Sequence, residues 1–322
     1  MAGRRRQQRA GQLERIKRHL EQSGIPISIQ ATTAPGSGVT MARAAIREGA
    51  DLIVVCGGDG TINEVVCGMA LSSVPLAVLP GGTANGLARE LRLPLDIEAA
   101  ARWIPCATPR RIALGRVVGS MLEPKPGCMI DRYFLSMVGV GFDAQVLTRI
   151  KGNWKDRLGM IHYAVEALRQ AVWNGFPPFT VSAGETRLEA TFACISRPQY
   201  YGPFRMIREA EFFSDRFRVY CLPSRKLARY LLYALSLFTG KLSRLPDVVT
   251  FPATQIRCEE TAVGDRPVLF QVDGELAGRL PITAGIVPDA LTLLVPPTGS
   301  RRFLARCGPG GRWRGREGDC GG

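Results

Sequence analysis

Two glycine-rich turns, each placed between an apolar run and a helical pattern, constrain the fold of this 322-residue chain more than any other feature. The sequence GGDG (57–60) follows the apolar run 51–56, and PGG (80–82) follows the apolar run 75–80. Helical spacing resumes after each turn. Near-continuously apolar strands that alternate with helices favour a parallel sheet covered on both faces. The first part of the chain is therefore predicted to be an α/β domain.

Further elements are predicted around these turns. Residues 11–22 and 39–48 have helical spacing, and residues 25–30 alternate between apolar and polar side chains as a strand does. Residues 62–71 are predicted to form the helix that follows the first turn.

The pattern changes near residue 105, where short alternating runs separated by turn residues begin, among them 132–138 and 291–295. Such runs favour an antiparallel sandwich or barrel, here with two helices at 156–173 and 225–239. We therefore expect an α/β domain over 1–105 and a β-sandwich domain over 106–298. The residues after 298 are rich in Gly and Arg without periodicity, so 299–322 is expected to be a disordered basic tail.

The helix predicted at 225–239 is the most apolar in the chain, and basic residues flank it. It is either a helix half-buried against the sandwich or an amphipathic segment that rests on a membrane surface. Its apolar length is well below the ~20 residues that a transmembrane helix needs.

Charge and composition exclude several classes of chemistry. Only two histidines occur, which argues against His-rich metal sites and most His-based triads, and the nine cysteines contain no C-x-x-C pair. The cysteines therefore indicate small core residues in a reducing compartment. The net charge of +14 lies mostly at the ends, with +6 over 1–18 and +4 over 299–322. Nucleic acid, an anionic membrane, a phosphate-bearing ligand or solvated termini would each explain that distribution.

The two turns together indicate an anion site. Glycine leaves no Cβ between backbone and ligand, and free N–H groups at a helix start favour a phosphate. The turns match neither the dinucleotide fingerprint nor the P-loop pattern. Asp59 is the unusual residue, because a carboxylate that faces phosphates requires a divalent cation between them. The alternative is that Asp59 caps a helix beginning at Thr61 or Ile62.

The sequence resembles the diacylglycerol kinase catalytic-domain family, which includes bacterial lipid kinases and the sphingosine and ceramide kinases. The resemblance is carried by GGDGTINEVVCGM (57–69), PGGTANGLARELRLP (80–94), VGVGFDAQV (138–146), YGPFRMIREAEFFSD (201–215) and FQVDGE (270–275), and also by KDRLGMIHYAVEAL (155–168). It covers about residues 1–297 in order. It implies a nucleotide-binding α/β domain followed by a β-sandwich substrate domain.

The resemblance also implies roles for individual residues. Glu275 would be the general base that takes the proton from the lipid hydroxyl, and Asp59 would organise Mg²⁺ and water at the phosphates. A structural Mg²⁺ would be held by Asp215 with the main-chain carbonyls of Phe212 and Phe217. The residues implied to contact ATP are Thr32, Gly58, Asp59, Gly60, Thr61, Ile62, Asn63, Glu64 and Thr83.

The chain departs from the family pattern at three places. The family begins with a strand that ends in Asn-Pro-x-x-Gly, whereas this sequence starts at Met1-Ala2-Gly3, so we expect that the first strand is missing through a misplaced start codon. Gly86 replaces an aspartate that often follows the asparagine of the second motif. Arg216 replaces the glycine of the Asp-Gly metal turn.

These features lead to a main hypothesis and three alternatives. The main one is an ATP- and Mg²⁺-dependent kinase that phosphorylates a hydroxyl of a diacylglycerol-like or sphingoid- or ceramide-like membrane lipid. The alternatives are a soluble small-molecule kinase of the NAD kinase and phosphofructokinase group, an inactive truncated family member, and a non-enzymatic binder of nucleic acid or anionic surfaces. No recognition-helix pattern supports the last of these, so no nucleic-acid partner is expected. We expect a cytoplasmic protein, peripheral at the inner face of the membrane; a homodimer is left open.

Overall fold

A computed structural model of the chain describes residues 2–121, 128–148, 177–201, 204–205, 210–239, 241–261 and 267–297. The predicted helix at 156–173 and the predicted tail at 299–322 lie outside these ranges. The chain forms two compact units, one made of Met1–Arg111 with Ala290 onward and the other of Ile112–Asp289.

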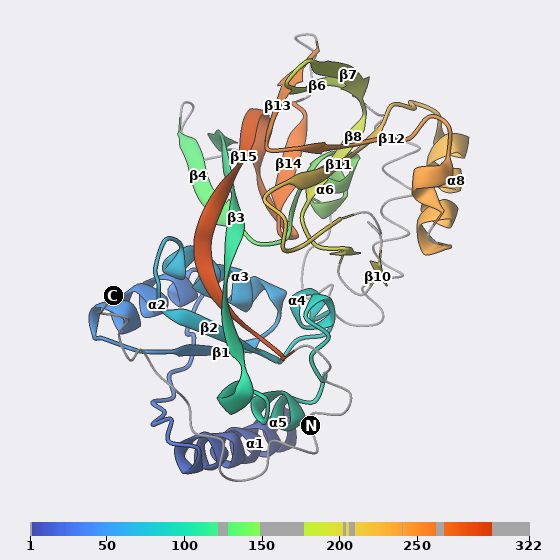
Figure 1. Cartoon of the computed structure of the whole chain (residues 1–322). Coiled ribbons are helices and arrows are strands. Elements are labelled where there is room, and N and C mark those ends of the chain that lie inside the picture. Colours follow the sequence, from blue (N-terminus) through green and yellow to red (C-terminus); the bar gives the residue numbers. More distant parts are fainter. Residues whose placement is uncertain are drawn as a thin grey trace. The chain divides into compact units, whose positions relative to one another are not determined.

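The first unit is an α/β arrangement. Its elements are α1 (Ala2–Gln22), α2 (Ser37–Arg47), β1 (Ile53–Gly57), α3 (Asp59–Met69), β2 (Pro75–Pro80), α4 (Gly86–Glu90), α5 (Ile97–Ala101) and the 3-10 helix η1 (Ile104–Cys106). β1 and β2 pair in parallel, from Ile53 opposite Leu76 to Gly57 opposite Pro80. Helices α2 and α3 lie on one side of these strands, and α1 and α5 lie on the other (Figure 1).

The end of the chain supplies a further strand to this unit. β15 (Glu275–Val295) is a single long strand, and its residues Thr292 and Leu293 pair in parallel with Pro75 and Leu76 of β2. The sequence pattern indicated a separate short strand at 291–295 within the sandwich domain. Backbone pairing instead joins residues 290–297 to the first unit.

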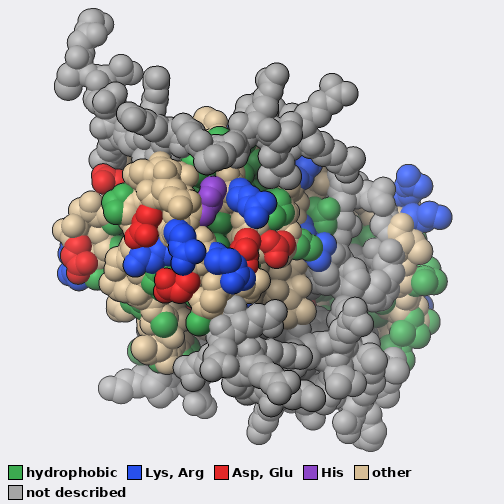
Figure 2. Space-filling model, turned by 90° about the horizontal axis from the view of Figure 1, so that it is seen from below, with side chains coloured by type: hydrophobic (Ala, Val, Ile, Leu, Met, Phe, Trp, Pro, Cys, Tyr) green, Lys and Arg blue, Asp and Glu red, His purple; other side chains and the backbone are tan. Residues whose placement is uncertain are grey.

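Helix α1 closes one side of the first unit. Ile16 and Leu20 are buried, and Arg15 forms a 2.7 Å ion pair with Glu98 of α5. The surface over α1 carries basic and acidic side chains interspersed, without a patch of one sign among the described residues (Figure 2).

The strand predicted at 25–30 is wrong. Gly24 has a φ of 80°, and the N–H of Ile25 donates to the carbonyl of Leu20 at 2.9 Å. This is the arrangement that ends many helices, in which the residue after the glycine packs back on the helix. Ile25 is therefore buried as part of the end of α1, and no strand follows it.

The second unit is antiparallel, which confirms the predicted sandwich-like domain. Nine strands are hydrogen-bonded in the order β12-β11-β8-β5-β14-β15-β13-β6-β7, and β3 pairs with β15 and β4. The remaining elements are β3 (Thr108–Met121), β4 (Met129–Phe134), β5 (Met137–Gly141), α6 (Phe142–Leu147), β6 (Phe179–Ala183), β7 (Thr186–Ala190), β8 (Phe192–Ser196), β9 (Tyr200–Tyr201), β10 (Phe204–Arg205), β11 (Phe217–Leu222), α8 (Leu227–Phe238), η2 (Leu242–Arg244), β12 (Val249–Ala253), β13 (Gln255–Glu260) and β14 (Leu269–Val272). Phe134 and Phe217 stack in its core with ring centroids 5.6 Å apart.

One run predicted as a single strand, 132–138, forms two strands with a break after Phe134. The carboxylate of Asp273 accepts hydrogen bonds from the N–H groups of Leu135, Ser136 and Met137 at 2.8–3.1 Å. Because these N–H groups point to a side chain, the backbone leaves one strand and begins the next.

Helix α8 belongs to the second unit, and two of its own side chains, Tyr230 and Tyr233, are buried. Among the described residues, none of the helices combines the length and the apolar composition needed to cross a bilayer.

The two glycine turns of the first unit touch each other. The N–H of Gly81 donates to the carbonyl of Gly57 at 2.8 Å. A Cβ placed on Gly82 would lie only 2.5 Å from the Cα of Gly58. The two backbones can approach this closely because position 82 carries no side chain.

We expect the substitution Gly82→Ala to lower the free energy of unfolding by about 1–3 kcal/mol, because the new methyl group would meet backbone that cannot rotate away. Thermal unfolding followed by circular dichroism measures the change. Gly285→Ala is the matched control, since a Cβ at Gly285 meets nothing within 4 Å. Equal unfolding midpoints for the two variants would contradict the close packing of the turns.

Candidate functional site

The candidate nucleotide site lies at the edge where β1 and β2 end. Parallel neighbours bring their carboxyl ends to the same edge of a sheet, where ligands bind in α/β folds. β1 ends at Gly57 and β2 at Pro80, and the two glycine turns begin there. The helix after the first turn begins at Asp59 rather than at residue 62.

Asp59 does not cap its own helix, so the capping alternative is wrong. The residue before the helix is Gly58, and no side chain caps α3. Instead, Oδ1 of Asp59 accepts a 2.8 Å hydrogen bond from the N–H of Gly86, the first residue of α4. The carboxylate is thereby held between the two turns, and it makes no other hydrogen bond or ion pair among the described residues.

Some backbone N–H groups of the two turns are used within the scaffold, and others have no acceptor. In the second turn the N–H of Gly82 donates to Oδ1 of Asn85, and those of Gly81 and Gly86 are bonded as described above, while the N–H groups of residues 83–85 have no acceptor among the described residues. At the start of α3 the N–H groups of Asp59, Gly60 and Thr61 have no acceptor among the described residues. Free N–H groups at a helix start attract an anion, so the first turn is the candidate phosphate cradle.

Several residues implied to contact ATP lie at or near this edge. Gly58, Asp59, Gly60 and Thr61 form the end of the first turn, and Thr83 is exposed in the second. Thr32 is exposed in the segment that precedes α2.

The other three residues of the first motif that are implied to contact ATP have structural roles or are buried. Ile62 is only 1% exposed and lies in the core, and Asn63 is buried with its Oδ1 unpartnered among the described residues. The carboxylate of Glu64 accepts the N–H groups of Gly36 and Gly38 at 2.8 and 2.9 Å. Glu64 therefore joins α3 to the start of α2.

Arg9 is a site residue that the sequence patterns did not single out. Its guanidinium donates to the carbonyl of Gly81 at 2.9 Å and lies 4.0 Å from the Sγ of Cys56. A cation at the glycine turns favours a bound phosphate. The run of arginines at the start of the chain was visible, but the sequence does not indicate which of them reaches the turn.

Glu275, the predicted base, belongs to the second unit and stands at the start of β15. Its side chain is 53% exposed and lies 3.4 Å from the guanidinium of Arg132. A carboxylate with one long contact and open surroundings is free to turn toward a substrate hydroxyl.

Buried polar groups fix the turn that precedes Glu275. Asp273 and Gly274 have positive φ values of 51° and 85°. The Oε1 of Gln271 accepts the N–H of Gly274 at 2.7 Å, and its Nε2 donates to Oδ2 of Asp143 at 2.9 Å. Burial raises the pKa of the Asp273 carboxyl to about 6, although three backbone N–H groups and Arg132 oppose that shift. These contacts position Glu275 through its neighbours in the chain.

Of the three residues implied to hold a structural Mg²⁺, Phe212 has a carbonyl that is already engaged. The carbonyl of Phe212 already accepts a hydrogen bond from the buried guanidinium of Arg197 at 2.6 Å. Asp215 is exposed in the turn before β11, and the side chain of Phe217 is buried. In the part of the chain that the structure describes, no three His, Cys, Asp or Glu side chains gather as a metal site.

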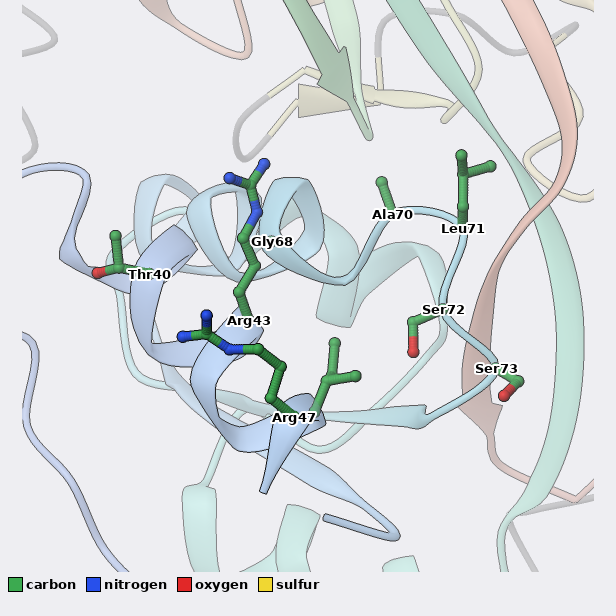
Figure 3. A pocket seen from close by; sticks show the side chains of 9 residues that line it. Thr40, Arg43, Arg47, Gly68, Ala70, Leu71, Ser72 and Ser73 are labelled. Carbon is green, nitrogen blue, oxygen red and sulfur yellow. The ribbon is translucent and has the colours of Figure 1, made fainter. Parts of the chain in front are cut away.

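A separate hollow of about 730 Å³ lies elsewhere on the first unit, between α2 and the 70–73 segment. Arg43 and Arg47 extend from α2 beside it, and Leu71, Ser72 and Ser73 lie on the facing segment (Figure 3). None of the predicted site residues lines this hollow.

Two family models match the chain, one after the other. Residues 2–117 match the family model described as the diacylglycerol kinase catalytic domain. Residues 136–295 match the model described as the YegS C-terminal NAD kinase beta sandwich-like domain.

Individual relatives cover parts of the chain. It is 35% identical over 159 residues to a diacylglycerol kinase of Bacillus subtilis, a match that covers 48% of each protein. It is 26% identical over 304 residues to an uncharacterized protein of Synechocystis, covering 88% of this chain and 66% of that protein. The match thus spans less than two thirds of the length of either relative.

A solved structure shares the fold. The crystal structure of a diacylglycerol kinase from Bacillus anthracis superposes with a TM-score of 0.65 at 21% identity, over 87% of this chain and 91% of that one. With the two domain matches and the paired glycine turns, the chain belongs to the diacylglycerol kinase catalytic-domain family.

Proposed function

We propose that the chain is an ATP- and Mg²⁺-dependent kinase that phosphorylates a hydroxyl group of a membrane lipid. The observation that carries the proposal is the open start of α3, where three unbonded N–H groups stand beside the carboxylate of Asp59. Phosphoryl transfer depends on positioning and charge stabilisation more than on covalent participation by the protein. This cradle supplies both, and the family membership supports phosphate chemistry there.

Asp59 is the proposed ligand of the nucleotide's Mg²⁺. Oδ1 is fixed by the N–H of Gly86, so the carboxylate keeps a defined direction. Oxygen donors of this kind suit Mg²⁺, which retains waters and bridges carboxylate to phosphate. When bound, the ion would neutralise charge on the phosphates. The backbone N–H groups of α3 and the guanidinium of Arg9 would share that task.

Glu275 is the proposed general base for the lipid hydroxyl. A dissociative transfer requires only weak activation of the nucleophile, which a carboxylate can provide. The support is its exposure together with the buried scaffold beneath it, in which Gln271 holds the N–H of Gly274.

Helix α8 is the proposed contact with the membrane. Leu231, Leu232 and Leu235 are 53%, 37% and 62% exposed on the face opposite the buried tyrosines. Lys226 precedes this helix and Lys241 follows it, and neither has an ion-pair partner among the described residues. An apolar helix face between cations is suited to the interface of an anionic bilayer.

The substitution Asp59→Asn should reduce kcat/KM for ATP by at least about 100-fold, because the amide keeps the bond from Gly86 but loses the charge that faces Mg²⁺. Initial rates at varied ATP and Mg²⁺ give this value. Asp96→Asn is the matched control, since Asp96 also accepts one backbone N–H, from Ala99 at 2.8 Å. A similar loss in both variants would contradict a specific role for Asp59.

The substitution Glu275→Gln should lower lipid phosphorylation by about 100-fold or more while ATP binding stays nearly unchanged, because only proton acceptance is lost. Transfer of labelled phosphate from ATP to vesicles that contain diacylglycerol, sphingoid bases, ceramide or undecaprenol measures it. Glu185→Gln, at an exposed turn of the same unit, is the control. Label found only in a water-soluble product would instead support the small-molecule kinase. No transfer by the unaltered chain would support the inactive member.

The double substitution Leu231→Asn and Leu235→Asn should weaken binding to anionic vesicles about tenfold or more. The reason is that two apolar side chains are no longer transferred from water into the bilayer interface. Co-sedimentation with vesicles of phosphatidylglycerol and phosphatidylcholine measures this. Leu95→Asn, at a leucine 46% exposed in the first unit, is the control. If all three proteins bind equally, α8 is not the contact surface.

A further inference from the structure

Arg197, the residue directly after β8, is a charged side chain with no exposed surface. One guanidinium nitrogen, Nη2, donates to the carbonyl of Phe212 at 2.6 Å, and Nη1 donates to the carbonyl of Ala113 in β3. The guanidinium also lies 5.2 Å from the centre of the Phe212 ring. Arg197 therefore joins two strands of the second unit to the segment that precedes β11.

The charge of Arg197 has no close counterion. Within the described residues, no carboxylate lies at ion-pair distance from it, and its Nε has no hydrogen-bond acceptor. Burial lowers the pKa of its guanidinium to about 10, while the charge of Asp215 acts in the opposite direction. The group thus remains a cation at neutral pH. A buried charge is costly unless polar groups solvate it, and here carbonyl oxygens do so.

The same carbonyl belongs to the metal set that the family resemblance implies. A divalent ion would have to approach the oxygen of Phe212 to about 2.1 Å, where the guanidinium is already bonded. Arg216 and Arg218 also line the hollow of about 290 Å³ that Asp215 and Phe217 border. A doubly charged ion in this hollow would meet Arg216 and Arg218 beside the carboxylates of Asp215 and Glu211, with the Phe212 carbonyl bonded to Arg197.

We propose that the guanidinium of Arg197 takes the place of a structural divalent cation in the second unit. It binds the carbonyl of Phe212 and leaves Asp215 as a longer-range counter-charge. The segment from Ala210 to Arg216 is then held against β3 and β8 by a covalently attached cation, and its stability does not depend on free Mg²⁺. Unfolding is the readout, so the outcome is independent of whether the chain phosphorylates a lipid.

The first experiment measures thermal unfolding of the unaltered full chain without nucleotide, in EDTA and in millimolar MgCl₂. The expected result is the same midpoint in both. A midpoint that rises with Mg²⁺, and that no longer rises in Asp215→Asn, would overturn the proposal.

The second experiment separates Arg197 from the neighbouring Arg216. Arg197→Gln should lower the midpoint by about 5 °C, because two buried carbonyls lose a charged donor. Arg187→Gln, at an exposed position of β7, should leave it unchanged. In EDTA and MgCl₂, Arg216→Gly should stay insensitive to Mg²⁺, whereas the combination of Arg197→Gln with Arg216→Gly should gain Mg²⁺-dependent stabilisation. Stabilisation of Arg216→Gly alone would show that Arg197 does not exclude the ion.

Discussion

The close approach of two backbones, at Gly58 and Gly82, is the constraint on which the first unit depends. It lets β1 and β2 end side by side and brings the N–H of Gly86 to the carboxylate of Asp59. A side chain at Gly82 would push the turns apart and release that carboxylate. In the second turn the N–H groups of Gly81, Gly82 and Gly86 are used to build this scaffold, and those at the start of α3 stay available for an anion.

In the second unit, buried polar side chains fix the geometry of the turns. Asp273 ends one strand and starts another by taking three N–H groups, and Gln271 ties the next turn to Asp143. Such networks are stabilising only when each member is satisfied, and they then impose one geometry. The exposed Glu275 thus extends from a rigid base. Asp143 and Asp273, two carboxylates within the family motifs, act here as structural supports.

The sequence predicted those parts of the fold whose signals are local. The strands at 53–57 and 75–80, the helix at 37–47 and the antiparallel character of the second unit follow from apolar periodicity and turn residues. Contacts distant in sequence were not predictable in this way. The break after Phe134 depends on Asp273. Arg9 bonds to the carbonyl of Gly81 and Arg197 to that of Ala113, each more than 70 residues away. The alternation at 25–30 was misleading, because Ile25 is apolar in order to pack on the end of α1 and not because it begins a strand.

The long strand β15 makes the first unit discontinuous in sequence. Its beginning carries Glu275, and its end pairs with β2 at the heart of the α/β sheet. A fragment that stops near residue 111 would expose the buried edge of β2, a row of unpaired backbone groups that favours aggregation. The minimal autonomous form of the first unit is consequently a circularly permuted or linked chain that fuses residues 290–297 back to it. During synthesis, too, the first unit cannot complete its sheet until nearly the whole chain has been made, because its last strand comes from residues 290–297.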